Sequence, residues 1–90
     1  MSTYGVNSLL ASVRLLEAAG RLGSFSAAAS ELGMTQPGVS QQIAQTERAL
    51  GVALFVRRHR GVTLTADGAT LDSAAADALA RLADALGAIR

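Results

Sequence analysis

The side chains best suited to bind another molecule lie in residues 36–41, whose sequence is QPGVSQ. Glutamine amides can form paired hydrogen bonds with the edge of adenine, and serine hydroxyls can reach bases or phosphates. If residues 36–50 form a helix, with about 100° between successive residues, its polar and apolar side chains separate. One face carries Pro37, Gln41, Ala44 and Arg48, with Gln36 and Ser40 beside them, and the other carries Val39, Ile43, Thr46 and Leu50. The outer face either contacts bases or is an ordinary solvated helix face.

A group of arginines follows this segment, although the net charge of the chain is only +1. Four of the eight basic residues fall within residues 48–66, which contain no acid: Arg48, Arg57, Arg58 and Arg60. The planar guanidinium group suits phosphates and guanine edges. A basic stripe beside a polar helix face favours a surface that binds a nucleic-acid duplex. A solvated arginine cluster is the alternative.

Two helices with a tight break between them would position the polar face. Ser24 is a suitable N-cap for the first helix, because its hydroxyl can accept a hydrogen bond from a free N–H group of the first turn. Gly33 can close that helix, and Thr35 can cap the second helix with Pro37 in its first turn. The apolar residues of the first helix share one face: Phe25, Ala28, Ala29 and Leu32. The pattern is typical of a helix-turn-helix, and a plain helical hairpin is the alternative.

The residues before the motif predict one further helix that covers its back. Asn7 or Ser8 can cap this helix and Gly23 can end it, whereas residues 1–6 show no pattern and are expected to form a loose terminus. One side of the helix is lined by Leu9, Val13, Leu16 and Gly20. Arg14 points away from this stripe, and we expect it to be solvated rather than to contact DNA.

The residues after the motif predict a β-hairpin. Two short β-branched and apolar runs, residues 52–56 and 62–65, flank the charged loop of residues 57–61. Leu54, Phe55 and Leu64 are expected to anchor the hairpin to the core, which leaves Arg57, Arg58, His59 and Arg60 near its tip. A hairpin attached to a helix-turn-helix is a wing, and arginines at its tip can contact phosphates or the minor groove. We expect His59 to be an exposed bystander rather than a pH switch.

The last part of the chain predicts one long helix over residues 66–90, capped by Thr65 and carrying Asp67 in its first turn. At about 36 Å, it is longer than so small a core requires. Its apolar residues alternate in steps of four and three, as in a coiled-coil seam. The seam and its neighbours are Leu71, Ala75, Ala78, Leu79, Leu82, Leu86 and Ile89. We expect this helix to form a dimer, and packing along its own domain is the alternative.

The composition argues against several classes of protein. The chain has no cysteine, one histidine and no glycine-rich phosphate loop, so we expect no metal site, no cofactor and no catalytic residues. Aromatic residues make up only 3% of the chain, which favours a closely packed helical core of Ala, Leu, Ile and Val. No apolar run approaches the length of a membrane span and no secretory leader is present, so we expect no membrane partner and a cytoplasmic location.

Over residues 9–89 the sequence resembles the amino-terminal DNA-binding domain of LysR-type bacterial transcriptional regulators. The resemblance rests on the segments GSFSAAASELGMTQPGVSQQI and LGVALFVRRHRGVTLTADG. The matching positions are Ser24, Phe25, Ala28, Ala29, Gln36, Pro37, Ser40, Ile43, Glu47, Leu50, Gly51, Leu54, Phe55, Arg57, Arg60, Leu64, Thr65 and Gly68. The resemblance implies a mainly α fold, with a three-helix core, a two-stranded wing and a long linker helix that pairs two subunits.

The resemblance also implies function. Residues 1–65 would form the DNA-binding domain and residues 66–90 the dimerisation helix of a transcriptional regulator, which reads an interrupted inverted repeat of double-stranded DNA as a homodimer. Three groups of residues would contact DNA: Thr35, Gln36, Pro37, Ser40 and Gln41 on the recognition helix, Ser24 and Ser26 at the start of the preceding helix, and Arg57, Arg58 and Arg60 on the wing. The family's effector-binding domain lies outside this sequence, so the chain is either an excised domain or a short protein. A small-molecule effector would bind only if that domain exists.

Three positions depart from the family pattern. Position 41 is often basic and is Gln here, so its base preference does not carry over. Thr46 replaces a usual leucine, which we expect to loosen the buried side of the helix, and Gly38 costs up to about 1 kcal/mol relative to alanine within a helix. A winged helix that binds a protein partner through its last helix, without DNA, is the rival interpretation.

Overall fold

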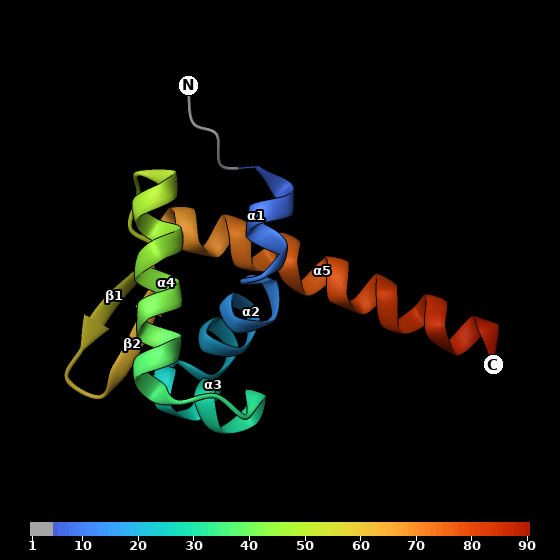
Figure 1. Ribbon diagram of the computed structural model, residues 1–90, viewed down its shortest axis with the longest axis horizontal. Helices are drawn as coiled ribbons and strands as arrows, with labels where there is room; N and C mark the ends of the chain where they lie inside the picture. The colour runs from blue at the N-terminus through green and yellow to red at the C-terminus, as the bar shows by residue number, and fades with distance from the viewer. Residues whose placement is uncertain (1–4) are drawn as a thin grey trace.

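The computed structural model describes residues 5–90. Within them the chain forms five helices and one antiparallel hairpin (Figure 1). The elements are α1 (Val6–Leu10), α2 (Val13–Leu22), α3 (Phe25–Leu32), α4 (Gln36–Leu50), β1 (Phe55–Arg58), β2 (Gly61–Leu64) and α5 (Ala66–Ile89). The hairpin lies beside α4, and the C-terminal half of α5 projects away from the body (Figure 1). The predicted mainly helical winged helix-turn-helix with a long last helix is confirmed.

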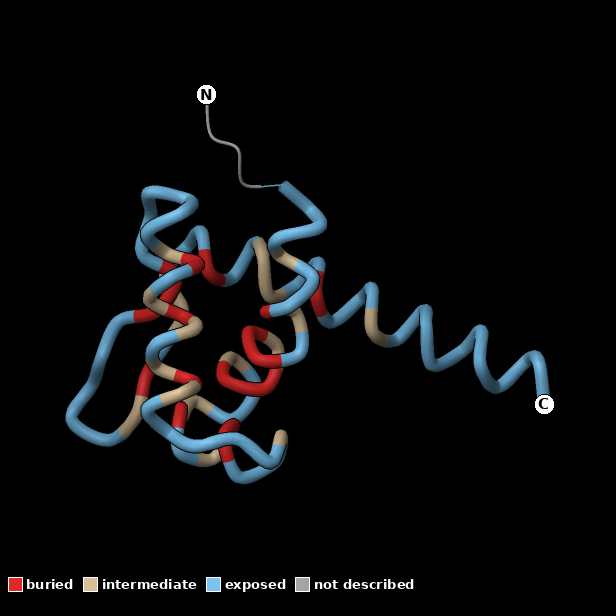
Figure 2. The backbone as a smooth tube through the Cα atoms, viewed as in Figure 1, coloured by how far each residue is buried: buried red, intermediate tan, exposed pale blue. Residues whose placement is uncertain are grey.

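The core lies where α2, α3 and α4 meet, and the hairpin closes one side of it (Figure 2). Small alanines let the helices approach closely, so the few large side chains fill the remaining space. Phe25 and Phe55 pack edge to face, with ring centroids 5.2 Å apart. The buried apolar residues are Leu15, Leu16, Ala18, Ala19, Phe25, Ala28, Ala29, Val39, Ile43, Leu54, Phe55, Val62 and Ala75.

The predicted N-caps of α3, α4 and α5 and the predicted glycine ends of α2, α3 and α4 are confirmed. Each of three hydroxyls accepts a hydrogen bond from the backbone N–H three residues later, at 3.0–3.1 Å: Ser24, Thr35 and Thr65. Three glycines end the preceding helices with φ of 64°, 67° and 74°: Gly23, Gly33 and Gly51. These ends form as predicted because capping depends on residues close together in the chain.

The prediction of one helix before the motif is wrong, because the chain breaks at Ala11 and Ser12 into α1 and α2. Helix α1 is preceded by Gly5, which provides no side-chain cap, so neither Asn7 nor Ser8 caps it. The Ser12 N–H donates to the Leu9 carbonyl at 2.8 Å, which tightens the chain at the break. Of the predicted loose terminus, residue 6 lies in α1, and residues 1–4 lie outside the described part of the chain.

Both strands of the hairpin lie closer to its turn than predicted. Its register pairs Phe55 with Leu64 and Arg58 with Gly61, so only two residues form the turn. The expected loop of residues 57–61 is therefore wrong, because Arg57 and Arg58 lie in β1. A strand can continue through arginines when its outer side faces solvent. Gly61 has a φ of 108°, and a Cβ there would lie 2.2 Å from the Gly23 carbonyl oxygen, so the turn requires glycine.

Helix α5 starts against the core and then leaves it. Leu71 is half-buried and Ala75 is buried against the body of the same chain. Beyond them only Leu79 is half-buried, and the helix is exposed from residue 80 to its end (Figure 2). The exposed fractions of Leu82, Leu86 and Ile89 are 62%, 57% and 80%. The predicted seam is thus divided between an internal half and an uncovered half. Within residues 5–90, no helix is long and apolar enough to cross a bilayer.

Asp72 marks a tight contact between α5 and α2. A Cβ at Gly20 would lie 2.8 Å from the Asp72 Oδ1 atom, which is buried and has no hydrogen-bond partner within residues 5–90. Burial, and then the nearby charge of Glu17, raise the pKa of the Asp72 carboxyl. The native state therefore loses stability as the pH rises from the ordinary aspartate range through this raised pKa.

We expect the change Gly68→Ala to lower the free energy of unfolding by about 2 kcal/mol, because α5 starts in close contact with the hairpin. A Cβ at Gly68 would lie 2.0 Å from the Leu54 carbonyl oxygen. Urea unfolding followed by circular dichroism measures the change. Gly87→Ala is the matched control on the same helix, where a Cβ would meet no atom, and should raise stability by up to about 1 kcal/mol. Equal effects of the two changes would refute this account of the contact.

Candidate nucleic-acid interface

The first turns of α4 present the predicted reading face to solvent. Thr35, Gln36, Pro37 and Gln41 are exposed, and Ser40 is half-buried. The Gln36 Nε2 atom donates to the Ser40 Oγ atom at 3.0 Å, so these two side chains are held together on one face. The structure thus presents amide and hydroxyl groups that can form hydrogen bonds with base edges.

The opposite face of α4 packs against the core as predicted, except at Leu50. Val39, Ile43 and Thr46 are buried as predicted, whereas Leu50 is 37% exposed because the last turn of α4 extends beyond the core. The Thr46 hydroxyl forms a 3.0 Å hydrogen bond with the hydroxyl of Ser12. A polar group with a hydrogen-bond partner is not costly to bury. Thr46 was expected to loosen the packing of α4, and it instead forms a directional contact with α2's N-cap residue.

A hollow of about 260 Å³ lies where α3, α4 and the hairpin meet. Ser24 and Ser26 come from the start of α3, Gln36 from the start of α4, and Arg57 and Arg58 from β1. The structure therefore brings together residues from all three groups predicted to contact DNA. Both guanidinium groups, the amide and the free N–H groups of a helix start are suited to an anion such as a phosphate.

Arg57 differs most from its predicted place at the wing tip. Its guanidinium carbon lies 5.3 Å from the centroid of the Phe25 ring, a cation–π contact that draws the side chain back from the turn. It also lines a second hollow, of about 60 Å³, together with Ser40 and Ala44 of α4. Arg57 is therefore a link between the wing and the recognition helix.

The other two wing arginines are more open. The Arg58 Nε atom donates to the Thr63 hydroxyl on the neighbouring strand at 3.1 Å, and the residue remains exposed. Arg60 lies in the exposed turn with His59. Of the three predicted wing residues, only Arg60 lies in the turn itself.

The three wing arginines are not neutralised by acidic side chains of the described residues. Both ion pairs within residues 5–90 involve Arg21, which contacts Glu17 at 2.9 Å and also Glu31. The hydrogen bonds that its guanidinium group donates to these two carboxylates raise the pKa of Arg21. Arg57, Arg58 and Arg60 form no ion pair within the described residues, so their charges can act on a bound anion. The same part of the chain contains no cluster of three metal-binding side chains.

Glu47 positions the wing, and sequence reasoning missed this contribution. Its Oε2 atom accepts hydrogen bonds from the backbone N–H groups of Leu54 at 2.7 Å and Phe55 at 3.2 Å. The carboxylate thus connects α4 directly to the start of β1. The sequence placed Glu47 only within a family pattern, since helical spacing does not reveal which distant N–H groups a carboxylate meets.

Comparison with known proteins agrees with this geometry. The model of the family described as "Bacterial regulatory helix-turn-helix protein, lysR family" matches residues 10–69. The uncharacterized HTH-type transcriptional regulator y4mQ of Sinorhizobium fredii is 51% identical over 73 residues, which are 81% of this chain and 24% of that protein. The chain therefore spans about a quarter of the length of this curated relative.

Two solved structures of DNA complexes are also similar to this chain. The DNA-binding domain of CbnR, crystallised with DNA, is 33% identical with a TM-score of 0.72, and the match covers 89% of this chain and 97% of that one. The DNA-binding domain of BenM, crystallised with benA site 1 DNA, is 30% identical with a TM-score of 0.78, over 89% and 90% of the two chains.

We expect Glu47→Ala to destabilise the chain by about 2 kcal/mol, because it removes a charged acceptor from two backbone N–H groups. Hydrogen exchange of the Leu54 and Phe55 amides, together with urea unfolding, measures the effect. Glu31→Ala is the control, because it removes only an exposed contact with Arg21 and should cost less than about 1 kcal/mol. Unchanged exchange at Leu54 would mean that Glu47 does not hold the wing.

Proposed function

We propose, given that this chain belongs to the LysR family of bacterial regulatory helix-turn-helix proteins, that it binds double-stranded DNA sequence-specifically as a dimer. The chain carries the DNA-binding domain of a transcriptional regulator, and this family is not one of enzymes. The observation that best supports binding to a duplex is the hollow that gathers Ser26, Gln36, Arg57 and Arg58 beside the exposed face of α4. Homologous domains crystallised on DNA add further support.

The contacts divide by chemistry. Gln36, Ser40 and Gln41 are assigned to base edges in the major groove, because amides and hydroxyls distinguish bases by their donor and acceptor patterns. Contacts to the DNA backbone would set the position of α4 on the duplex. These contacts are assigned to Thr35 and Pro37 at the start of α4 and to Ser24 and Ser26 at the start of α3. The Ser24 hydroxyl already caps α3, so its contribution would come mainly through the helix start.

The arginines are assigned to the sugar–phosphate backbone. Arg57 and Arg58 would bind phosphates beside the hollow, and Arg60 in the turn would reach the minor groove, whose negative potential attracts arginine. Three arginines from each of two subunits would neutralise about six phosphates, which gives a log–log salt slope near −5. Steep salt dependence is therefore part of the proposal.

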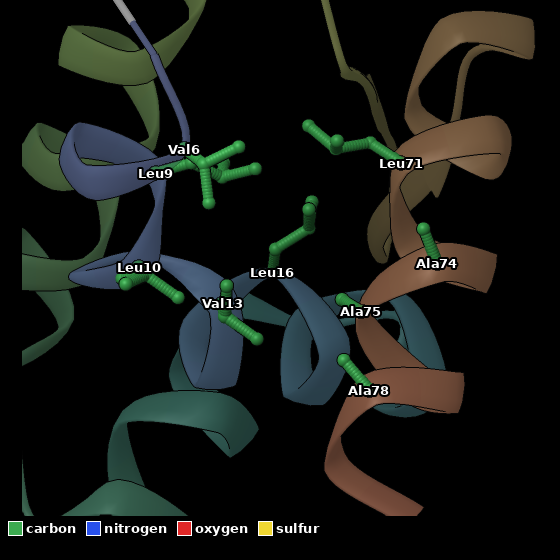
Figure 3. Close-up of a pocket in the computed structure, with 9 residues that line it drawn as sticks. All are labelled: Val6, Leu9, Leu10, Val13, Leu16, Leu71, Ala74, Ala75 and Ala78. Atoms are coloured by element: carbon green, nitrogen blue, oxygen red, sulfur yellow. The ribbon is translucent and has the colours of Figure 1, made fainter. Parts of the chain in front are cut away.

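The uncovered half of α5 supports a homodimer through that helix. Leu82, Leu86 and Ile89 form an exposed apolar stripe, which water does not favour. Beside it, α1, α2 and α5 enclose an apolar hollow of about 190 Å³, lined by nine aliphatic residues that include Leu10 and Leu71 (Figure 3). A second copy could cover both surfaces. Two recognition helices would then read an interrupted inverted repeat, whose half-sites recur at about 34 Å.

The organisation beyond these residues is also a proposal. Residues 1–65 would act as the DNA-binding domain and residues 66–90 as the linker helix that forms the dimer, in the cytoplasm. A small-molecule effector would act only through a further domain outside this sequence. The exposed stripe on α5 also favours a second candidate, a module that binds a protein partner without DNA. Salt-sensitive binding to a duplex separates the two candidates.

The proposed division of contacts predicts different effects of single changes. Ser40→Ala or Gln41→Ala should weaken binding to a selected cognate duplex by about 5- to 150-fold, with little effect on a scrambled duplex. Arg57→Ala should weaken both and make the salt slope shallower by about 2 per dimer. Fluorescence anisotropy at several salt concentrations measures these quantities.

Arg90→Ala, at the end of α5, is the control for loss of one positive charge far from the hollow. It should change neither the ratio of cognate to scrambled affinity nor the salt slope appreciably. Equal losses for Ser40→Ala, Gln41→Ala and Arg57→Ala on both duplexes would rule out the division. An absence of duplex binding at low salt would favour the module that binds a protein partner.

The dimer predicts that Leu86→Glu yields a monomer, because a charge would replace an apolar side chain in the seam. Sedimentation equilibrium measures the mass in solution. Ala80→Glu places the same charge on the same helix at an exposed position about 160° from Leu82, and should leave the dimer intact. A native chain that is monomeric at all concentrations tested would rule out a dimer through α5.

A further inference from the structure

We propose that Ser12 is a positioning residue for the reading face of α4, an inference that rests on the proposed sequence-specific binding of DNA. Ser12 lies at the break between α1 and α2, on the side of α4 opposite to its outer face. Its hydroxyl, the Thr46 hydroxyl and the Gln42 side-chain amide set how α4 is rotated about its own axis. This rotation decides which side chains of α4 face outward.

The contact is a closed ring of three hydrogen bonds. The Gln42 Nε2 atom donates to the Ser12 Oγ atom at 2.9 Å. The Thr46 hydroxyl donates its one hydrogen to the Gln42 carbonyl oxygen at 3.0 Å, so in the 3.0 Å contact between the two hydroxyls Ser12 is the donor. Each hydroxyl therefore both donates and accepts. The ring begins and ends at Gln42 on the recognition helix.

The ring is shielded from water. The exposed fractions of Ser12 and Thr46 are 1% and 3%, and Gln42 is half-buried. Buried hydroxyls without partners are costly, so a rotation of α4 that separated Thr46 from Ser12 would be penalised. The neighbouring buried residues, Val39 and Ile43, are apolar and make contacts without directional preference. The ring thus provides the directional constraint on this face.

The ring fixes the side chain that lies at the edge of the reading face. Gln41 and Gln42 carry the same amide and lie about 100° apart around the helix. The buried face of Val39 and Ile43 turns Gln41 outward, whereas Gln42 lies at the edge of that face, where it could turn either way. In the structure Gln41 is exposed, whereas Gln42 is bound to Ser12. Ser12 therefore holds Gln42 on the inner side of α4, where its amide does not compete with that of Gln41 for the duplex.

Removal of the hydroxyl tests the proposal. Ser12→Ala should lower the ratio of cognate to scrambled affinity at least about fivefold, the effect of one misread base pair. The cognate duplex is first selected by the native chain from a pool of random duplexes. The salt slope on the scrambled duplex should not change, because the arginines are untouched. Ser73→Ala, exposed on α5, is the matched control and should leave the ratio at its native value.

A double variant separates positioning from stability. In Ser12→Ala with Thr46→Val, both hydroxyls are replaced by apolar groups, which should restore the unfolding midpoint close to that of the native chain. The affinity ratio should remain low, because Gln42 still lacks its partner. A ratio that recovers together with stability would overturn the proposal, as would a native ratio in Ser12→Ala.

The side-chain amide resonances of Gln42 provide a readout without DNA. In the native chain they should be protected from exchange and distinct from those of Gln41. In Ser12→Ala the chemical shifts and exchange rates of the Gln42 side-chain amide should approach those of the exposed Gln41 amide. Unchanged Gln42 resonances would overturn the positioning by Ser12. If the native chain selects no sequence from the pool, the proposed function fails, while these resonances still decide whether Ser12 holds Gln42.

Discussion

The surroundings of Leu54 hold together the parts that the DNA-facing surface needs. Its N–H group donates to the Glu47 carboxylate of α4, and its carbonyl accepts from the Thr65 N–H group at the start of α5. Its side chain is 1% exposed, and the same carbonyl packs against the backbone of Gly68. The recognition helix, the wing and the last helix therefore meet at one residue. A displacement there would change the position of all three.

The side chains on this surface are arranged before any DNA is bound. Arg57 lies over the Phe25 ring, and Gln36 is hydrogen-bonded to Ser40. Side chains that are already ordered lose less conformational entropy on binding. In the same way, the ring of hydrogen bonds at Ser12 would hold α4 in the rotation that exposes Gln41. The rigid core thus supports a reading face whose geometry is set in advance.

Helix α5 lies in two environments along its length, the core and the solvent. Its first half is part of the core through Ala75 and Leu71, and its second half leaves Leu82, Leu86 and Ile89 uncovered. The core of so small a domain is shorter than α5, so the apolar residues on the far half of the helix have nothing within residues 5–90 to cover them. The proposed dimer would cover these residues. Pairing through α5 would then also set the distance between the reading faces of the two subunits.

The sequence by itself determined the local structure: the caps at Ser24, Thr35 and Thr65, the glycines that end the helices, and the order of helices, hairpin and long helix. It also identified the candidate residues on α4, because a helix face follows from spacing alone. Only the tertiary structure decided that the first helix breaks at Ser12, that Arg57 turns back onto Phe25, that Glu47 holds the wing, and that the seam of α5 becomes fully exposed after Leu79. The physical reason is distance along the chain: caps and turns depend on neighbouring residues, whereas these features arise from contacts between residues that only folding brings together.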